Sequence, residues 1–353
     1  MPLRRVGQVL AVPAVCLLSL LLLSAPAGAQ GVAEGDLLFS SNRVDVLGPN
    51  SEIFRMNPDG SAETRLTNSP ANDVDPAWSP DATKIAFVRI GVVRGEKVSP
   101  GQIWVMNADG SGQRRLTRGA AKADATPVFS PDGSTIAFTR NRVAKGNSAV
   151  FAMNADGTNE RRLTSPPGFE GFPAYSPDGS QIVYTSDQDG QPELYKMNAD
   201  GTAQTRLTTN AAVETHAAWS PDGSQIAFLS DRLGTFQVFV MPASGGTPRL
   251  VTTGVDDEDT ASGDYTPKWS PDGRRIAFTA SHDESFEIVV IDAAGGTPAP
   301  LTAAAGSDFG GDWHHPPGTP AAIPAAVRRT APAPPPGDSW SGVPSSVALL
   351  CQI

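Results

Sequence analysis

Short apolar runs, each ended by Gly, Pro, Asn or Asp, recur along the chain at a regular interval. The motif Ser-Pro-Asp occurs five times directly after an aromatic residue, and nine residues after that aromatic comes the aromatic of an Ile-Ala-Phe-like run. An apolar run ending in Met or Ile, a turn of the Asn-Ala-Asp-Gly type and a Leu-Thr pair follow. Short β-rich runs between turn residues predict hairpins of strands. The five aromatics are Trp78, Phe129, Tyr175, Trp219 and Trp269.

Each repeat therefore contains four predicted strands, which we call a to d in chain order. Strand a ends at the aromatic, b is the Ile-Ala-Phe-like run, c ends at Met or Ile, and d contains Leu-Thr. Ser-Pro-Asp-Gly suits a type I turn, because Pro presets φ and Gly accepts the left-handed backbone that follows. A repeat of 44–51 residues with four strands is typical of one β-propeller blade.

The number of predicted strands indicates how the ring closes. The first copy, Asp36 to Thr67, contains b, c and d but no a, whereas Asp308 to Trp313 has the spacing of a strand a and stands alone. Pairing these two segments avoids two open sheet edges and an exposed apolar blade face. We therefore expect an all-β protein with six four-stranded antiparallel blades, closed by a 3+1 clasp.

The repeated Trp-Ser-Pro-Asp-Gly, Ile-Ala-Phe, Met-Asn-Ala-Asp-Gly and Leu-Thr motifs resemble those of the TolB-type propellers, which are related to the propellers of prolyl-oligopeptidase-type peptidases. The resemblance covers Asp36 to Trp313. It implies the six-bladed fold much more specifically than a function. TolB itself carries an α/β domain ahead of its propeller, used with partners of the Tol–Pal system, and here the repeats begin without it.

Both ends of the chain differ in composition from the repeats. Residues 1–29 combine Arg4 and Arg5, an apolar run and a small-residue site ending at Ala29, so we expect a cleaved signal peptide. The protein would then be exported, to the periplasm, the cell envelope or the extracellular space, without a stable membrane anchor. Residues 30–315 would form the propeller, and the Pro- and Ala-rich residues 316–353 a disordered tail.

Net charge and cysteine content limit the kinds of partner and of stabilisation that we expect. The net charge is −10, and removal of Arg4 and Arg5 would take it to −12. An acidic chain without basic clusters is unsuited to nucleic acid. Only Cys351 would remain after cleavage, so no intramolecular disulfide is expected and the core must stabilise a monomer.

Loop lengths distinguish the two faces of the predicted ring. The a–b and c–d turns are almost constant in length, while the b–c and d–a connections vary and contain every sizeable insertion. We call the face with the a–b and c–d turns the fixed face, and the face with the b–c and d–a connections the variable face. Insertions collected on one face often mark a binding surface. They are Arg89–Gln102, Asn141–Ser148 and Val255–Gly263.

An acidic residue recurs five residues before each strand-a aromatic, where strand a starts at the variable face. Six such acids would ring the channel mouth and could bind a divalent cation such as calcium, or a basic or arginine-bearing peptide. Alternatively, each acid caps its own loop by accepting backbone N–H bonds. His216 follows one of the acids by two residues and is a further candidate ligand. The acids are Asp73, Asp124, Glu170, Glu214, Asp264 and Asp308.

The sequence favours a binding protein over an enzyme. It has no Gly-x-Ser-x-Gly elbow and no phosphate-binding glycine loop, so we expect no catalytic residues and no required cofactor. Our first hypothesis is an exported scaffold whose protein or peptide ligand meets the variable face around the acidic mouth. The alternatives are a metal-dependent lyase or lactonase using the same mouth, and a truncated relic of a longer propeller protein.

Overall fold

The structure is a computed structural model that describes residues 35–43, 50–93, 97–119, 122–142, 147–165, 168–252, 264–282, 285–303 and 306–314. The predicted signal peptide, the predicted tail and the Val255–Gly263 insertion lie outside the described residues. Within the described ranges, we find no helix with the length and apolar character that a membrane crossing requires.

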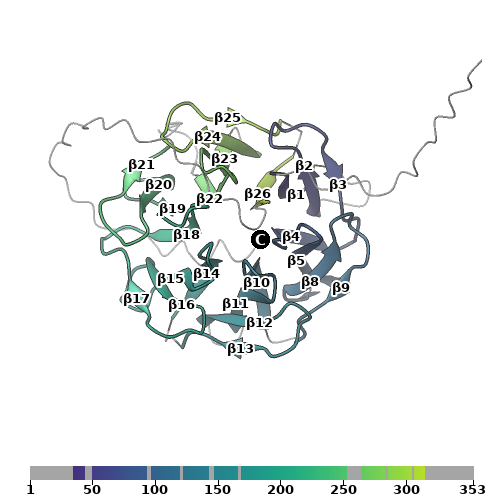
Figure 1. Ribbon diagram of the computed structural model, residues 1–353. Coiled ribbons are helices and arrows are strands. Elements are labelled where there is room, and N and C mark those ends of the chain that lie inside the picture. Colours follow the sequence, from purple (N-terminus) through teal and green to yellow (C-terminus); the bar gives the residue numbers. More distant parts are fainter. Residues whose placement is uncertain are drawn as a thin grey trace, which may run out of the picture.

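Six four-stranded antiparallel sheets surround a central axis (Figure 1). Blade 1 has the order β26 (Asp308–Trp313), β1 (Leu37–Ser41), β2 (Glu52–Met56), β3 (Thr64–Arg65). Blade 2 has β4 (Asn72–Trp78), β5 (Lys84–Ile90), β8 (Gln102–Asn107), β9 (Arg114–Arg115). Blade 3 has β10 (Lys122–Phe129), β11 (Thr135–Arg142), β12 (Asn147–Asn154), β13 (Arg161–Arg162).

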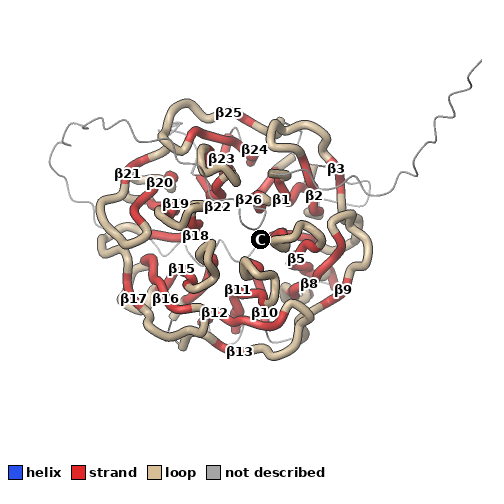
Figure 2. The backbone as a smooth tube through the Cα atoms, viewed as in Figure 1, coloured by secondary structure: helices blue, strands red, loops and turns tan. Residues whose placement is uncertain are grey.

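The other three blades repeat this arrangement, with short outermost strands joined by long turns (Figure 2). Blade 4 has β14 (Glu170–Tyr175), β15 (Gln181–Ser186), β16 (Glu193–Asn198), β17 (Thr205–Arg206). Blade 5 has β18 (Glu214–Trp219), β19 (Gln225–Ser230), β20 (Gln237–Pro242), β21 (Arg249–Leu250). Blade 6 has β22 (Asp264–Trp269), β23 (Arg275–His282), β24 (Ser285–Asp292), β25 (Ala299–Pro300).

The predicted 3+1 clasp is confirmed. Strand β26 pairs antiparallel with β1, and its register sets Trp313 opposite Leu37 and Asp308 opposite Ser41. The seam between blades 6 and 1 has a core like those of the other seams, because Phe39, Phe54 and the fully buried Trp313 pack against blade 6. The ends of the described chain therefore share one sheet, and the ring has no open edge.

The Ser-Pro-Asp-Gly turns form because the side chains satisfy the backbone groups that the reversal exposes. In blade 3 the Ser130 hydroxyl donates to Asp132 (2.5 Å) and accepts the Thr135 N–H (3.0 Å). Asp132 also accepts the Ser134 N–H (3.0 Å), and Gly133 adopts φ +71°. Ser, Asp and Gly thus each have a separate role in the turn, which explains why they recur together.

The threonine after each strand d, which follows Leu directly in five blades and follows Leu250-Val251 in blade 5, has a role that the repeat alone did not indicate. Its hydroxyl accepts a strand-c backbone N–H beyond the end of the two-residue strand d, at 2.9–3.0 Å in every blade. Each of these hydrogen bonds is buried, so each satisfies a donor that would otherwise be costly. The pairs are Thr67–Ile53, Thr117–Ile103, Thr164–Val150, Thr208–Leu194, Thr252–Val238 and Thr302–Ile288.

Apolar side chains of neighbouring blades form the core. Met153 of blade 3, for example, lies in one cluster with Ala86 and Ile103 of blade 2. The five strand-c methionines are at most 1% exposed, so they fill space in this core. The repeats are therefore structural units that are stabilised by the blades beside them.

Candidate functional site

The b–c and d–a connections emerge on the same face of the ring, where the acid-bearing ends of strands a also lie. The insertion in blade 2 contains an extra hairpin, β6 (Val92–Val93) with β7 (Lys97–Val98). The insertion in blade 3 lengthens β11 and β12 instead, which stay paired as far as Arg142 and Asn147. The structure thus shows two different uses of extra residues on the variable face.

The six predicted acids do stand at equivalent places, at or near the start of each strand a. The five whose side chains are described are at most 1% exposed, however, so they do not present open carboxylates to solvent. For Asp264 the structure describes only the backbone, at the start of β22. The five described carboxylates are those of Asp73, Asp124, Glu170, Glu214 and Asp308.

Arginines from the same blade pair with four of these carboxylates. In blades 2 and 3 the arginine lies directly opposite the acid on strand b, as in the Arg140–Asp124 pair with contacts of 2.6 and 2.9 Å. In blades 1 and 5 a serine lies opposite the acid, and an arginine two residues later reaches back to it. The other pairs are Arg89–Asp73 (2.6 Å), Arg43–Asp308 (2.6 Å) and Arg232–Glu214 (2.6 Å).

Each of these guanidinium groups also lies over two aromatic rings. The Arg140 guanidinium carbon is 5.0 Å from the centroid of Phe138 on strand b and 4.8 Å from that of Phe151 on strand c. Burial alone would lower the pKa of Arg140, but hydrogen bonds to Asp124 and Glu160 outweigh it and raise the pKa. The acid, the arginine and the two rings form a buried unit that ties strand a to strand b.

These units were not predicted, although the sequence contains a signal for them. The arginine follows the strand-b aromatic by two residues in Phe87/Arg89 and Phe138/Arg140 and by four in Phe39/Arg43 and Phe228/Arg232. We predicted that the acids bind a ligand or cap their own loops through backbone N–H groups. In these four contacts the acid instead pairs chiefly with an arginine of its own blade. Ligand binding by the six acids remains a prediction.

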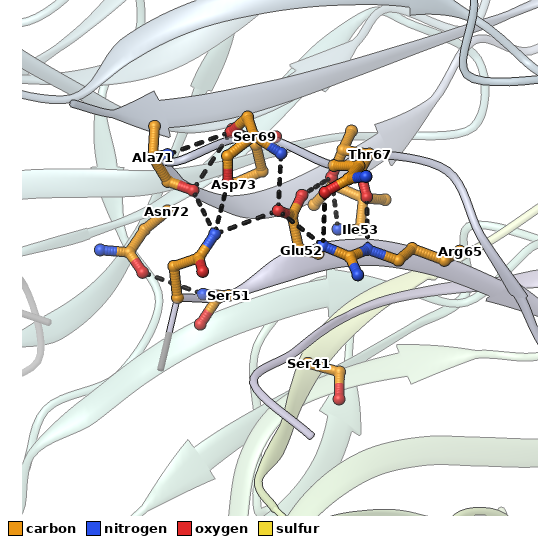
Figure 3. Close-up of polar contacts among 12 residues, drawn as sticks. Ser41, Ser51, Glu52, Ile53, Arg65, Thr67, Ser69, Ala71, Asn72 and Asp73 are labelled. Atoms are coloured by element: carbon orange, nitrogen blue, oxygen red, sulfur yellow. Dashed lines mark hydrogen bonds and ion pairs between the residues drawn. The ribbon is translucent and has the colours of Figure 1, made fainter. Parts of the chain in front are cut away.

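A further carboxylate at the start of strand c is equally well satisfied in blade 1 (Figure 3). One oxygen of Glu52 accepts hydrogen bonds from Arg65 (3.0 Å), from the Ser69 backbone N–H (2.8 Å) and from Asn50 (3.0 Å). The other oxygen accepts the Thr67 hydroxyl. The variable-face ends of blades 1, 2, 3 and 5 therefore contain internally paired charges.

A β-bulge in each strand a shapes the wall of the central channel. The bulge residue has a left-handed φ of 48–55° in blades 2 to 6, and these residues are Asp75, Thr126, Phe172, His216 and Thr266. The bulges interact between blades, since Asp75 accepts the Thr126 N–H at 3.1 Å. Non-glycine residues in this conformation are uncommon and are held there by their surroundings.

His216 is not placed beside the carboxylate of Glu214. A spacing of two residues would place the two side chains on one side of a regular strand, but the bulge between Thr215 and Ala218 breaks this alternation. The His216 ring lies against Phe172, with centroids 3.8 Å apart, and burial lowers its pKa to about 3, with a smaller contribution from Lys268. Among the residues the structure describes, no three His, Cys, Asp or Glu side chains are grouped to hold a metal ion.

Two aromatic groups lie near the mouth of the channel. Phe169 contacts Phe172 at 5.4 Å between centroids, and Phe172 in turn contacts His216. Across the ring, Phe286 lies between Tyr265 (5.7 Å) and Phe309 (4.7 Å). Phe169, Tyr265, Phe286 and Phe309 are all partly exposed. Aromatic side chains at an accessible surface are typical of protein interfaces.

Six antiparallel blades closed by a shared sheet define a six-bladed β-propeller. The family model of the TolB beta propeller domain matches residues 120–210 and 165–308. The chain belongs to this TolB-type propeller family, as the repeated motifs indicated.

Individual relatives support this membership. A protein TolB homolog of Chlorobium luteolum is 29% identical over 160 residues, which are 35% of each chain. The Tol-Pal system protein TolB of Gluconobacter oxydans is 42% identical over 78 residues, which are 22% of this chain and 15% of the relative. The chain thus spans about a third or less of their lengths. The TolB crystal structure from Acinetobacter baumannii has the same fold, with a TM-score of 0.68, 22% identity, and coverage of 80% of this chain and 67% of the other.

Proposed function

We propose that this protein is an exported, non-enzymatic binding propeller whose protein or peptide ligand contacts the variable face around the channel mouth. The observation that carries this proposal is the pair of partly exposed aromatic groups near the mouth, Phe169–Phe172–His216 and Tyr265–Phe286–Phe309. Aromatic rings supply large contact area at low entropic cost, so they are suitable anchors for a partner.

The buried acid–arginine units have a supporting role in this proposal. Because four of the described acids are paired and desolvated, an incoming ligand would not meet four free carboxylates there. The units instead hold the starts of four innermost strands in place at the variable face. We infer a preorganised mouth, which lowers the entropic cost of binding.

Site-specific photo-crosslinking in cells that make the protein tests the choice of face. A photoreactive residue at Phe309 probes the variable face, and the same residue at the exposed Asp178 in the blade 4 a–b turn is the matched control on the fixed face. We expect a discrete crosslinked protein from position 309 and none from position 178.

The captured protein then allows a quantitative test. A peptide covering its crosslinked segment should bind at least ~10-fold more weakly to Phe286→Ala, the cost of losing one interface anchor. Equal crosslinking from the two faces, or unchanged affinity in Phe286→Ala, would contradict the proposal.

A further inference from the structure

Blade 4 has the acid of the repeated unit but no arginine of its own to pair with it. Ser186 lies opposite Glu170 in the register, as Ser41 and Ser230 lie opposite their acids in blades 1 and 5. Two residues further on, where those blades have Arg43 and Arg232, this blade has Gln188, whose side chain is exposed. Among the described residues, no Lys or Arg forms an ion pair with Glu170.

Three buried oxygens on one side of this blade lack hydrogen-bond partners among the described residues. They are one carboxylate oxygen each of Glu170 and Glu193 (both Oε2) and the hydroxyl of Tyr184. Glu170, Ser186 and Glu193 are consecutive cross-strand neighbours, so they share one side of the sheet, as does Tyr184, two residues before Ser186. All three side chains that carry these oxygens are at most 1% exposed.

The hydrogen bonds that Glu170 and Glu193 do accept leave the Oε2 atom of each without a partner. Glu170 accepts a long hydrogen bond from Ser186 (3.3 Å) through its other oxygen, Oε1. Glu193 accepts Arg206 (2.8 Å) and the Asn210 N–H (2.7 Å) through Oε1 alone. The equivalent Glu52 of blade 1 has both oxygens satisfied (Figure 3). Burial raises the pKa of Glu170, although the hydroxyls of Thr164 and Ser186 and the charge of Arg162 oppose the rise.

The aromatic part of the unit is complete in blade 4. Tyr184 and Tyr195 lie 5.8 Å apart between centroids, at the positions of the ring pairs that the arginines cover elsewhere. In the four complete blades the guanidinium carbon is 4.6 to 5.9 Å from these ring centroids. Blade 4 therefore offers a carboxylate without an ion-pair partner in Glu170, a second carboxylate in Glu193 that Arg206 pairs through Oε1 alone, a hydroxyl and a pair of ring faces.

This arrangement selects one kind of cation. A guanidinium is planar, carries five N–H donors and stacks on aromatic rings, so it can serve several acceptors and two rings at once. An ammonium is a more strongly hydrated point charge and loses more on burial. Within the same chain, four equivalent sites already hold a guanidinium by this combination of contacts.

We propose that the variable-face end of blade 4 binds the guanidinium group of an arginine side chain carried by a partner. Arg232 of blade 5 shows the route, because it starts from the b–c connection and reaches inward to Glu214. The partner's arginine would enter from the same side, displacing the exposed Gln188. This inference rests on the proposed use of the variable face by a partner.

Two substitutions test the site with argininamide as the probe. Gln188→Arg supplies the missing group from within the chain, so it should fill the site and raise the melting temperature. Glu170→Gln removes the central carboxylate. Gln204→Arg is the matched control, because it adds the same charge to an exposed position in the c–d turn of blade 4, on the fixed face.

Binding is measured by calorimetry, with citrullinamide as the uncharged analogue. We expect the unaltered protein and Gln204→Arg to bind argininamide at least ~10-fold more tightly than citrullinamide, and both site variants to lose this preference. Equal binding of the two probes by the unaltered protein, or a Gln188→Arg variant that binds argininamide unchanged, overturns the proposal. Crosslinking from Phe309 would persist in either case if only the arginine site is wrong, which separates the two failures.

Discussion

The contact between successive blades on the fixed face gives a sharp stability prediction. In every c–d turn a glycine lies close to the carbonyl of the residue that directly follows strand d in the preceding blade. A β-carbon built at Gly110 would be 2.3 Å from the Leu66 oxygen, whereas one at Gly245 would be 3.6 Å from the Leu207 oxygen. The two glycines have nearly the same backbone, with φ of +84° and +87°. Substituting both by alanine therefore isolates the contact between blades from the cost of the backbone conformation.

The expected magnitudes follow from these distances. Alanine in the left-handed region costs about 1–2 kcal/mol, partly offset by about 0.4–1 kcal/mol from the stiffer unfolded chain. Gly245→Ala should thus lower the free energy of unfolding by roughly 1 kcal/mol, since a 3.6 Å contact is unstrained. At Gly110 the methyl group must also push two blades apart, and overpacking typically adds about 1–3 kcal/mol.

Urea unfolding of the two variants beside the unaltered protein checks this prediction. We expect the transition midpoint to fall for both and to fall further for Gly110→Ala, at an unchanged slope. Equal losses for the two variants would refute the reasoning, because the blades would then not be held at the distance that the structure shows.

Three further predictions concern the turns, the strand ends and the clasp. Thr164→Val should lower the free energy of unfolding by about 1–3 kcal/mol, because the buried Val150 N–H loses its acceptor, while Thr164→Ser should retain most of the stability; similar values for the two would contradict the assigned hydrogen bond. Hydrogen bonds from Ser130 and Ser134 lower the pKa of Asp132 below its ordinary value of 3.8. The stability that these hydrogen bonds provide is therefore present above pH 3.8 and is lost as the pH falls through the pKa of the folded protein. Ser130→Ala should lower the free energy of unfolding by about 1 kcal/mol at pH 7, and by less in acid unfolding measured below pH 3.8. A chain ending before Asp308 loses the β26–β1 pairing and the Arg43–Asp308 ion pair, so its melting temperature should fall for the whole domain, and an unchanged value would count against the clasp.

Most of the fold could be predicted because its determinants are local and repeated. The Ser-Pro-Asp-Gly motif satisfies backbone groups within its own turn, and the Leu-Thr threonine satisfies one within its own c–d hairpin, so the same residues recur wherever the same geometry recurs. The clasp followed from counting strands, since β26 alone has the length and spacing that completes blade 1. These inferences needed no knowledge of contacts between distant residues.

The candidate site was only partly predictable, because its residues do not share one spacing. A carboxylate at the start of strand a can be satisfied by Arg140 directly opposite or by Arg232 from further along the chain, so no single interval reveals the partner. The bulges were missed for a similar reason. Aspartate, threonine, phenylalanine and histidine all occupy the left-handed position, so residue type gave no signal there.

The turns on the fixed face are nearly constant in length for a reason that does not involve ligands. The c–d glycines must meet the carbonyls of the preceding blade, and Gly60 meets Leu301 in this way across the closing seam. One inserted residue would break such a contact, while the hairpin β6–β7 shows that the other face accommodates extra residues within one blade. The difference in loop length between the two faces therefore follows in part from packing, because loops vary where they do not contact the neighbouring blade. The case for a binding face has to stand on the exposed aromatic groups and on the unpaired oxygens of blade 4, and both of these are open to direct measurement.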